Sequence, residues 1–384
     1  MTTLHGTFDP RFERLRRAIA TNLDAGTELG LSLCVDVKGE SLVDAWGGWR
    51  DLDRTMPWTD DTLVLVWSTT KTLASLAVLM LVYRGELDVY APVAKYWPEF
   101  AANGKERVEV RHLLSHTSGL SGWDLPFDPK EMYDLRASTA KFETQAPWWA
   151  PGSASGYHAN SFGHLNGELV RRVTGLTLGQ FIAEEISGPL GGDFHLGLSD
   201  QHLGRLATMY GPRSTTLPQP PEGDDVPPDW SIQRKTLGGC FTEPEMANDP
   251  EFQRAEIGAT NGHGHARGLN RIFSAISNGG VSHGVRVLSQ DTIDLIFDEQ
   301  SNGIDLVLAL PLRWGIGFAL ESRGVPYVKG NRTCFWGGWG GSMVVMDLER
   351  HLTITYTMNQ MQPGTIGSEL AEQYISLIDE ELAP

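Results

Sequence analysis

The sequence is poor in cysteine. Its 384 residues include only Cys34, Cys240 and Cys334, which lie far apart and form no CxxC pair and no cluster with histidine. This spacing argues against a disulfide framework and against a structural zinc site. Each cysteine is therefore expected to behave as a small buried apolar residue.

Positive charge is also scarce. The chain has 31 Lys and Arg residues against 48 Asp and Glu residues, so its formal net charge is −17. Nucleic acid and anionic membrane surfaces attract cationic proteins, and neither is expected as a partner. The hydrophobic share of 41% and the charged share of 21% are ordinary for a soluble globular protein, in which the acidity serves solubility.

No long hydrophobic run occurs. The longest, residues 73–83, is interrupted by Ser75 and is too short to cross a bilayer. Residues 1–18 contain arginine but no apolar core and no small-residue cleavage site, so they do not resemble a signal peptide. We therefore expect a soluble, cytoplasmic protein.

Several familiar catalytic and cofactor motifs are absent. No GxSxG occurs, which argues against an α/β-hydrolase, and no GxGxxG after a strand or GxxxxGK[ST] indicates a nucleotide site. His112 and His116 have the i, i+4 spacing of a zinc protease, but Leu113 stands where that motif requires glutamate. Neither a cofactor nor a metal ion is expected.

The N-terminal part of the chain alternates between helical and strand patterns. Amphipathic spacing predicts a helix over residues 9–24. Two strand-like runs follow, 30–37 and 40–46, and the two residues between them suit a tight hairpin. Residues 68–83 read as a helix that is apolar on nearly every side, so it should lie in the centre of the protein.

The C-terminal part returns to strand character. Residues 314–320, 342–347 and 352–358 are predicted as neighbouring strands, and residues 366–382 as a closing amphipathic helix. The proline-rich segment 211–229 is expected to form a long excursion over the surface.

These elements predict an α/β protein of the α+β type. An antiparallel sheet is built from both ends of the chain and flanked by N- and C-terminal helices, with a helical lobe inserted between its two parts. We assign residues 1–75 and 185–384 to the α/β domain and residues 76–184 to the mainly helical lobe. The active site is expected in the cleft between them.

The pattern SxxK occurs twice, at residues 68–71 and 138–141, and context separates the two copies. Ser68 follows an apolar extended run and opens the long buried helix, where backbone amides and the helix dipole favour developing negative charge. Lys71 shares its helix face, and burial lowers a lysine pKa, so a neutral amine becomes available to take a serine proton. Ser138 lies in a polar stretch and is expected to be structural.

Three further segments carry a family resemblance. They read RHLLSHTSGL at 111–120, PGSASGYHANSFGHLNGELVRRVTG at 151–175 and FWGGWGGS at 335–342. Together with STTK at 68–71, this ordered set resembles the class C β-lactamase-like serine hydrolases, most closely the branch called family VIII carboxylesterases. The resemblance extends over nearly the whole chain and implies a β-lactamase/transpeptidase-like fold.

The resemblance also implies roles for individual residues. Ser68 matches the family's nucleophile and Lys71 its general-base lysine. Tyr157 matches the tyrosine that relays protons, and a nearby lysine ammonium is expected to lower the pKa of its phenol so that it serves as base and then acid. The oxyanion hole would consist of the backbone amides of Ser68 and Trp339, the latter from the sheet-edge strand that bears the third motif.

Two departures from the β-lactamases bear on the substrate. Their tyrosine belongs to a Tyr-x-Asn motif that contacts the substrate amide, whereas here position 159 is Ala and Asn160 comes one residue late. Their third motif is Lys-Thr-Gly, whose lysine helps bind a carboxylate. Here the segment is Trp336-Gly337-Gly338, which resembles the third motif of family VIII esterases.

Aromatic residues around these motifs suit an apolar acyl or alcohol group. The tryptophans in or near the relevant loops are Trp123, Trp148, Trp149, Trp230, Trp336 and Trp339. The predicted substrate-binding residues are Trp123, His158, Trp336, Gly337 and Gly338. Three histidines could enter the site, although a structural role is the simpler expectation for each: His116, His158 and His263.

The leading interpretation is a serine hydrolase that cleaves small, uncharged, fairly apolar carboxylic esters through a Ser68 acyl-enzyme. One alternative is an acyltransferase that passes the acyl group to an alcohol or amine. A β-lactamase or D-aminopeptidase is disfavoured by Ala159 and Trp336, and a non-catalytic binding module by the intact Ser68, Lys71 and Tyr157. The expected partner is a small-molecule ester, and the sequence provides no basis for an oligomeric state.

Overall fold

The structure is a computed structural model that describes residues 3–213, 231–240 and 243–383. Trp230 and most of the proline-rich segment 211–229 lie outside the described residues.

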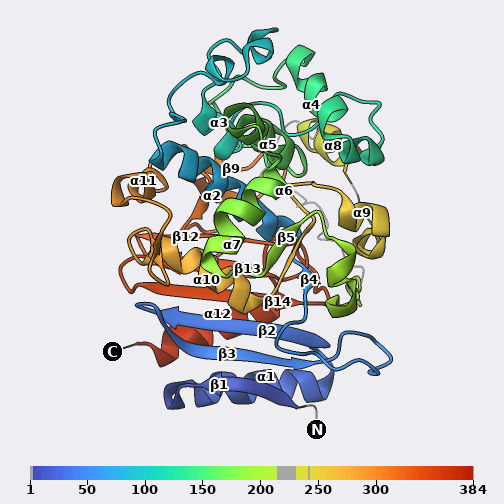
Figure 1. Cartoon of the computed structure of the whole chain (residues 1–384), viewed down its shortest axis with the longest axis vertical. Coiled ribbons are helices and arrows are strands. Elements are labelled where there is room, and N and C mark those ends of the chain that lie inside the picture. Colours follow the sequence, from blue (N-terminus) through green and yellow to red (C-terminus); the bar gives the residue numbers. More distant parts are fainter. Residues whose placement is uncertain (1–2, 214–230, 241–242, 384) are drawn as a thin grey trace, which may run out of the picture.

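A nine-stranded antiparallel sheet brings the two ends of the chain together (Figure 1). Its strand order is β1-β3-β2-β14-β13-β12-β11-β10-β9, so the C-terminal strand β14 lies directly beside β2. The strands are β1 (Leu4–Phe8), β2 (Gly30–Val37), β3 (Glu40–Gly48), β9 (Ser301–Ile304), β10 (Pro311–Trp314), β11 (Ala319–Leu320), β12 (Thr333–Gly337), β13 (Met343–Asp347) and β14 (Leu352–Met358).

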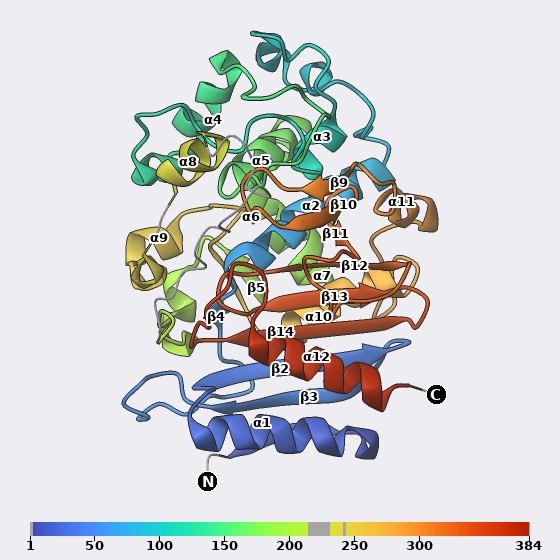
Figure 2. The same ribbon diagram turned by 180° about the vertical axis from the view of Figure 1, so that it is seen from behind.

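Helices cover both faces of this sheet. α1 (Glu13–Ala25) and α12 (Glu369–Glu381) pack together on the face seen in Figure 2, while α10 (Ala266–Ser277) covers the opposite face. The Thr355 hydroxyl of β14 donates to the Ala266 carbonyl at 2.8 Å, which holds the start of α10 on the sheet. The predicted sheet with terminal helices is therefore confirmed.

The central helix α2 (Thr70–Tyr83) carries the first SxxK lysine. All of its residues from Thr70 to Leu81 are buried, as the apolar pattern predicted. The other α-helices of the described residues are α3 (Val110–Leu114), α4 (Leu135–Thr144), α5 (Ser161–Thr174), α6 (Leu178–Phe181), α7 (Gly188–Leu190), α8 (Ser231–Gly238), α9 (Pro250–Arg254) and α11 (Gln290–Leu295). Two small sheets complete the fold: β4 (Val64–Leu65), β6 (Gly262–Gly264) and β5 (Phe194–Leu196) in that order, and the hairpin of β7 (Val281–Ser282) and β8 (Val285–Arg286).

The structure corrects one strand prediction and adds one strand that was not predicted. Residues 314–320 form no single strand, because a turn closed by the Gly315 N–H and the Phe318 carbonyl (3.0 Å) separates β10 from β11. Gly317 has a φ of +87° there, and a Cβ atom on it would lie 2.9 Å from the Ser75 Cβ. The polar strand β1, which pairs with β3, was missed because it shows no alternation of apolar residues.

The strand that carries the third motif is only partly an edge strand. β11 runs beside β12 but pairs with Cys334 and Phe335 alone. Trp336 and Gly337, at the end of β12, extend beyond that pairing. The predicted edge position is therefore wrong for the part of β12 that pairs with β11. It holds for Trp336 and Gly337, which carry the motif and have no partner on β11.

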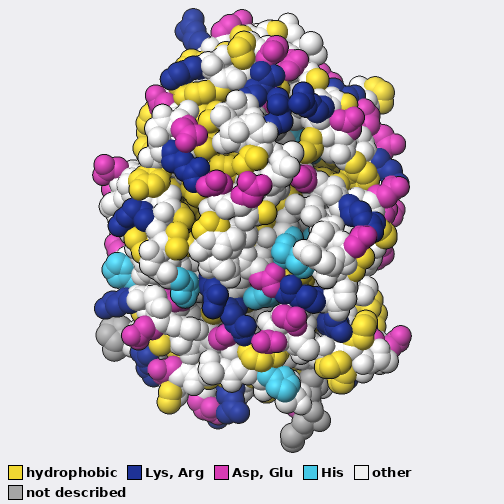
Figure 3. Space-filling model, viewed as in Figure 1, with side chains coloured by type: hydrophobic (Ala, Val, Ile, Leu, Met, Phe, Trp, Pro, Cys, Tyr) yellow, Lys and Arg dark blue, Asp and Glu magenta, His cyan; other side chains and the backbone are white. Residues whose placement is uncertain are grey.

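The division into residues 1–75 and 185–384 against 76–184 stays a prediction. Helix α8, which the prediction assigns to the α/β domain, lies beside α4 and α5 of the helical lobe in both views (Figures 1 and 2). The Thr236 hydroxyl of α8 lies 2.5 Å from the hydroxyl of Ser121, a residue of the predicted lobe. On the face drawn in Figure 3, acidic and basic side chains are interspersed. No helix within the described ranges is long and apolar enough to cross a membrane.

Candidate active site

The candidate nucleophile lies on a tight turn between β4 and α2. Residues Trp67–Thr69 form one turn of 3₁₀-helix, and Trp67 adopts a φ of +46°, a conformation that non-glycine residues rarely take. The Thr70 hydroxyl donates to the Trp67 carbonyl at 2.6 Å and stabilises this turn. Strained residues of this kind are concentrated at functional sites. Ser68 itself is half-buried at the start of α2.

Lys71 is buried directly beneath Ser68, with 2% of its surface exposed. Its Nζ lies 2.7 Å from the Ala159 carbonyl, 2.9 Å from the Ala259 carbonyl and 3.1 Å from the Ser68 Oγ. Burial lowers the pKa of Lys71 well below its ordinary value, so the neutral amine is favoured. A neutral amine has two N–H donors, which the two carbonyls accept, and its lone pair then faces the Ser68 hydroxyl.

Tyr157 completes a cluster with Ser68 and Lys71. Its phenol accepts a hydrogen bond from the Trp336 Nε1 at 3.3 Å, and the Lys71 Nζ lies 4.6 Å from the centre of its ring. Burial raises the pKa of Tyr157, and the hydrogen bonds of the phenol with Ser68 and Trp336 only partly oppose that shift. The expectation that a lysine ammonium lowers this pKa is therefore wrong, because both groups are buried and the lysine favours its neutral form.

The loop that carries Tyr157 is held in place by His116. The Gly156 N–H donates to the His116 carbonyl at 2.9 Å, and the His158 N–H donates to the His116 Nδ1 at 3.0 Å. His116 is buried with a φ of +61°, and burial lowers the pKa of its ring well below the ordinary value. It therefore acts as a neutral structural acceptor behind the tyrosine.

The third motif approaches the nucleophile turn closely enough to require glycine. A Cβ atom on Gly338 would lie 2.2 Å from the Val66 carbonyl oxygen, so no larger residue fits without moving the backbone. The Ser342 hydroxyl donates to that same carbonyl at 2.8 Å and lies 2.9 Å from the Thr69 hydroxyl. These contacts place the turn that bears the Trp339 N–H against the turn that bears the Ser68 N–H.

Aromatic rings surround this junction. The Trp339 ring packs on Trp67 with centroids 5.2 Å apart, and the Trp336 ring lies 5.2 Å from Tyr157 and 4.6 Å from Trp314. Trp336 is only 2% exposed, and its ring packs against Tyr157 and Trp314 in the core. No cation takes the place of the β-lactamase lysine at this position of the sequence.

The side chains of two predicted substrate-binding residues are buried and bonded within the protein, and those predictions are corrected. Trp123 is buried, stacks on Phe127 at 4.4 Å and donates its Nε1 to the Ser138 carbonyl at 2.9 Å, so it belongs to the core of the helical region. His158 is fully buried, and its two ring nitrogens bond to the Gly156 carbonyl (2.7 Å) and the Ser118 hydroxyl (2.6 Å). Burial lowers the pKa of His158 to about 3.

The remaining candidates have structural surroundings. His263 is fully buried in β6, and burial lowers its pKa to about 3. Ser138 is buried in α4, where its hydroxyl donates to the Asp134 carbonyl at 2.7 Å. Lys141 pairs with Glu131 at 2.8 Å and does not contact Ser138 in any described bond. The second SxxK copy is therefore not assembled like the first.

Sequence reasoning missed three contributors to the cluster. The carbonyls of Ala159 and Ala259 orient Lys71, and the Ser342 hydroxyl joins the two turns. A backbone carbonyl carries no signal in residue type, so the first two could not be found from sequence. Ser342 is the last residue of the FWGGWGGS segment, and this position is the sequence feature from which its role could have been predicted.

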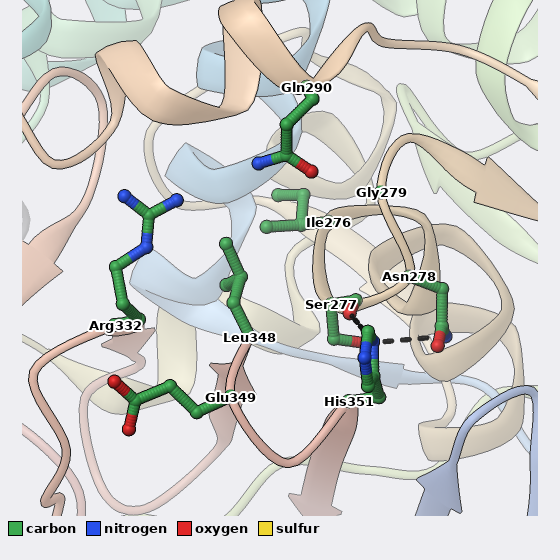
Figure 4. A pocket seen from close by; sticks show the side chains of 9 residues that line it. All are labelled: Ile276, Ser277, Asn278, Gly279, Gln290, Arg332, Leu348, Glu349 and His351. Atoms are coloured by element: carbon green, nitrogen blue, oxygen red, sulfur yellow. Dashed lines mark hydrogen bonds between the residues drawn. The ribbon is translucent and has the colours of Figure 1, made fainter.

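A separate hollow of about 270 Å³ lies beside the turn between β13 and β14 (Figure 4). Its lining comes from the end of α10, the start of α11 and the turn between β13 and β14, and the His351 Nδ1 bonds to the Ser277 carbonyl at 2.8 Å. None of the cluster residues lines it. Within the described part of the chain, no group of three or more His, Cys, Asp or Glu side chains is placed to hold a metal ion.

Comparison with known proteins agrees with this geometry. The family model described as Beta-lactamase matches residues 15–377. The protein named Esterase/beta-lactamase LipL of Mycobacterium tuberculosis is 31% identical over 93% of this chain and 83% of its own length. Esterase EstB of Burkholderia gladioli is 34% identical over 40% of this chain and 43% of its own length.

Solved structures extend the likeness to the whole fold. The crystal structure of a family VIII carboxylesterase superposes with a TM-score of 0.91 at 34% identity, covering 99% of this chain and 100% of the other. A penicillin-binding protein homolog from Caulobacter crescentus gives a TM-score of 0.90 at 34% identity with the same coverage. The fold, the match along residues 15–377 and the Ser68–Lys71–Tyr157 cluster place the chain in the beta-lactamase family.

Proposed function

We propose that the protein is a serine hydrolase of small, uncharged, fairly apolar carboxylic esters, acting through an acyl-enzyme on Ser68. The observation that carries the proposal is the pairing of Lys71 with two carbonyls, which directs its lone pair at the Ser68 hydroxyl 3.1 Å away. The relatives named as esterases and the family VIII carboxylesterase structure support the same reaction class.

In the acylation step, the neutral Lys71 amine takes the Ser68 proton as the Oγ attacks the ester carbonyl. The Oγ–C bond forms, and the carbonyl oxygen gains negative charge within reach of the Ser68 and Trp339 N–H groups. As the C–O bond to the alcohol breaks, the proton passes through the Tyr157 hydroxyl to the departing oxygen. The products are the free alcohol and an ester on Ser68.

Deacylation uses the same groups in the reverse sense. A water molecule gives its proton to Tyr157 and Lys71 while its oxygen attacks the acyl carbon. The Ser68 Oγ then leaves and recovers a proton from Lys71. The carboxylic acid is released, and the cluster returns to its neutral starting state.

The substrate class follows from the missing charged contact. A β-lactam presents a carboxylate and an amide, and the corresponding positions here are Trp336 and Ala159. A hydrogen bond to a charged group contributes about 1.5–3 kcal/mol, which corresponds to roughly one to two decades in rate. An uncharged ester needs only the nucleophile, the relay, the two amides and an apolar surface.

The test compares two chromogenic substrates with one enzyme preparation. We expect the kcat/KM for p-nitrophenyl butyrate to exceed that for nitrocefin at least about a hundredfold. Comparable values would overturn the assignment of substrate class. Adding a primary alcohol to the ester assay separates transfer from hydrolysis, because a transferase forms the new ester in preference to the acid.

A further inference from the structure

Asp305 is a fully buried carboxylate that directly follows β9 and contacts the tyrosine loop, residues 155–158. Its Oδ1 accepts hydrogen bonds from the N–H groups of Tyr157 (2.9 Å), Val307 (3.0 Å) and Leu308 (3.0 Å). Its Oδ2 is buried without a hydrogen-bond partner among the described residues. Burying a carboxylate with one oxygen unpaired is costly, so its presence requires a reason.

The tyrosine loop is held alternately from two sides. The N–H groups of Gly156 and His158 point to His116, and the N–H of Tyr157 between them points to Asp305. The Leu306 N–H also donates to the Ser155 carbonyl at 2.9 Å, which joins the two loops beside this contact. Among the described bonds, Asp305 is thus the side chain that fixes the backbone of the relay tyrosine itself.

The loop that carries Asp305 and Val307 is also tied to α8. The Gln233 amide donates to the Val307 carbonyl at 2.6 Å. Asp305 therefore lies where the hairpin of β9 and β10, the tyrosine loop and α8 meet. Its charge also adds to burial in holding the pKa of Tyr157 above the ordinary value, which keeps the phenol protonated.

We propose that Asp305 is a positioning residue for the proton relay: by accepting the Tyr157 N–H, it places the phenol between Ser68, Lys71 and the leaving group. The inference rests on the proposed function, because it assigns Tyr157 the relay role. A displacement of about 1 Å in a catalytic group costs on the order of a hundredfold in rate. Removing the acceptor should therefore lower kcat without changing the surface that binds the ester.

The experiment is a double-mutant cycle with Tyr157→Phe. We expect Asp305→Ala to lower kcat for p-nitrophenyl butyrate about 10- to 100-fold with little change in KM. Asp305→Asn keeps a carbonyl acceptor and should restore kcat to near the wild-type value. In the Tyr157→Phe background, Asp305→Ala should have almost no further effect, because the group that it positions is gone.

A matched control is provided by Asp51, whose carboxylate caps a loop and bonds to no cluster residue among the described hydrogen bonds. Its carboxylate accepts from the N–H groups of Thr55 (3.0 Å) and Met56 (2.9 Å) and is 7% exposed. Asp51→Ala should lower the thermal unfolding midpoint while its effect on kcat stays small and independent of Tyr157. Should Asp305→Ala fail to fold, Asp305→Glu, which displaces the acceptor by one methylene, enters the same cycle.

Labelling of Ser68 by a fluorophosphonate is measured in parallel for every variant. If the wild type labels rapidly but cleaves no ester, the proposed function falls, and the cycle is then evaluated on the labelling rate constants. Equal losses from Asp305→Ala in the wild-type and Tyr157→Phe backgrounds would overturn the positioning role. So would a loss in Asp305→Asn as large as that in Asp305→Ala.

Discussion

Ser68 and Ser138 occupy the same SxxK pattern in different surroundings. Ser68 is half-buried and 3.1 Å from a lysine amine, whereas the Ser138 hydroxyl bonds to the Asp134 carbonyl of its own helix start. We predict that Ser68→Ala abolishes ester hydrolysis and that Ser138→Ala leaves it near the wild-type rate. Mass spectrometry after a slow acylating ester should find one added acyl group on the wild type and none on Ser68→Ala. Full activity of Ser68→Ala would overturn the assignment.

The relay residues should behave as one unit. Tyr157→Phe should lower kcat more than about a hundredfold, because proton transfer by a positioned group contributes about 10²–10⁴-fold. Lys71→Ala should cost at least as much, and the double variant should lose little more than the worse single variant. Steady-state kinetics on the three variants provides the measurement. If Tyr157→Phe kept most of its turnover, the relay would have to be assigned elsewhere.

The pH dependence should reflect a neutral lysine. Burial holds the pKa of Lys71 well below the ordinary value of about 10.4, so the neutral amine becomes available at lower pH than in an exposed lysine. Activity should then fall as acid protonates Lys71, and it should not require pH values near 10. Lys71→Arg, which stays protonated, should be inactive throughout the range from about pH 5 to 10. An arginine variant that regained activity at neutral pH would contradict this account of the base.

At this scale, the sequence predicted the residues better than their protonation states. Ser68, Lys71 and Tyr157 could be selected from motif order, and the structure brings them together. The pKa direction of Tyr157 could not be predicted, because it depends on burial in the folded protein, which outweighs the hydrogen bond from Trp336. The same applies to Trp123, whose partners come from the helical core.

At the scale of elements, the end of β12 depends on close contact with the nucleophile turn. Gly338→Ala would place a Cβ atom 2.2 Å from the Val66 carbonyl, so the two turns must separate. We expect more than about a tenfold loss of kcat, because the oxyanion amides move relative to Ser68. Gly303→Ala in β9 is the matched control, since its Cβ would meet nothing within 4 Å. Equal activity in both variants would show that this contact does not set the amide positions.

Element boundaries were predictable where the pattern was local. The strand over residues 352–358 follows from the strict alternation of larger apolar or aromatic residues with threonine, and the buried central helix follows from its nearly continuous apolar run. The hairpin within residues 314–320 could not be predicted in this way, because a turn among apolar residues leaves a sequence pattern that reads as one continuous strand. Its glycines are explained only by close contacts in the folded protein: a Cβ atom on Gly317 would meet Ser75 of α2, and a Cβ atom on Gly315 would lie 1.8 Å from the Ile296 carbonyl oxygen.

At the scale of the whole molecule, a buried carboxyl group links the two ends of the chain. Glu28, after α1, accepts the Tyr356 hydroxyl of β14 at 2.7 Å and the Tyr374 hydroxyl of α12 at 3.4 Å. Burial raises the pKa of Glu28 from 4.5 to about 8. The folded protein therefore keeps this proton between those pH values while the unfolded chain releases it, so the free energy of unfolding falls as pH rises through that range.

Glu28→Gln removes this dependence. Between pH 5 and pH 8, titration of Glu28 should lower the free energy of unfolding of the wild type by roughly 3–4 kcal/mol. The variant lacks this titration, so its free energy of unfolding relative to the wild type should rise by the same amount over that range. Urea denaturation at the two pH values provides the measurement. A difference between variant and wild type that is the same at both pH values would contradict a neutral buried Glu28.

The position of β14 between β2 and β13 also sets the order in which the protein can be completed during synthesis. The Ser32 and Thr357 hydroxyls bond at 2.8 Å across the β2–β14 pair, although 325 positions separate them in the chain. Ribosomes add about 5–20 residues each second, so one edge of β2 waits roughly 15–65 s for its partner strand to emerge. An unpaired apolar strand is prone to pair with other chains during that interval. The nascent protein therefore has its greatest need of chaperone protection of the β2 edge until β14 has emerged.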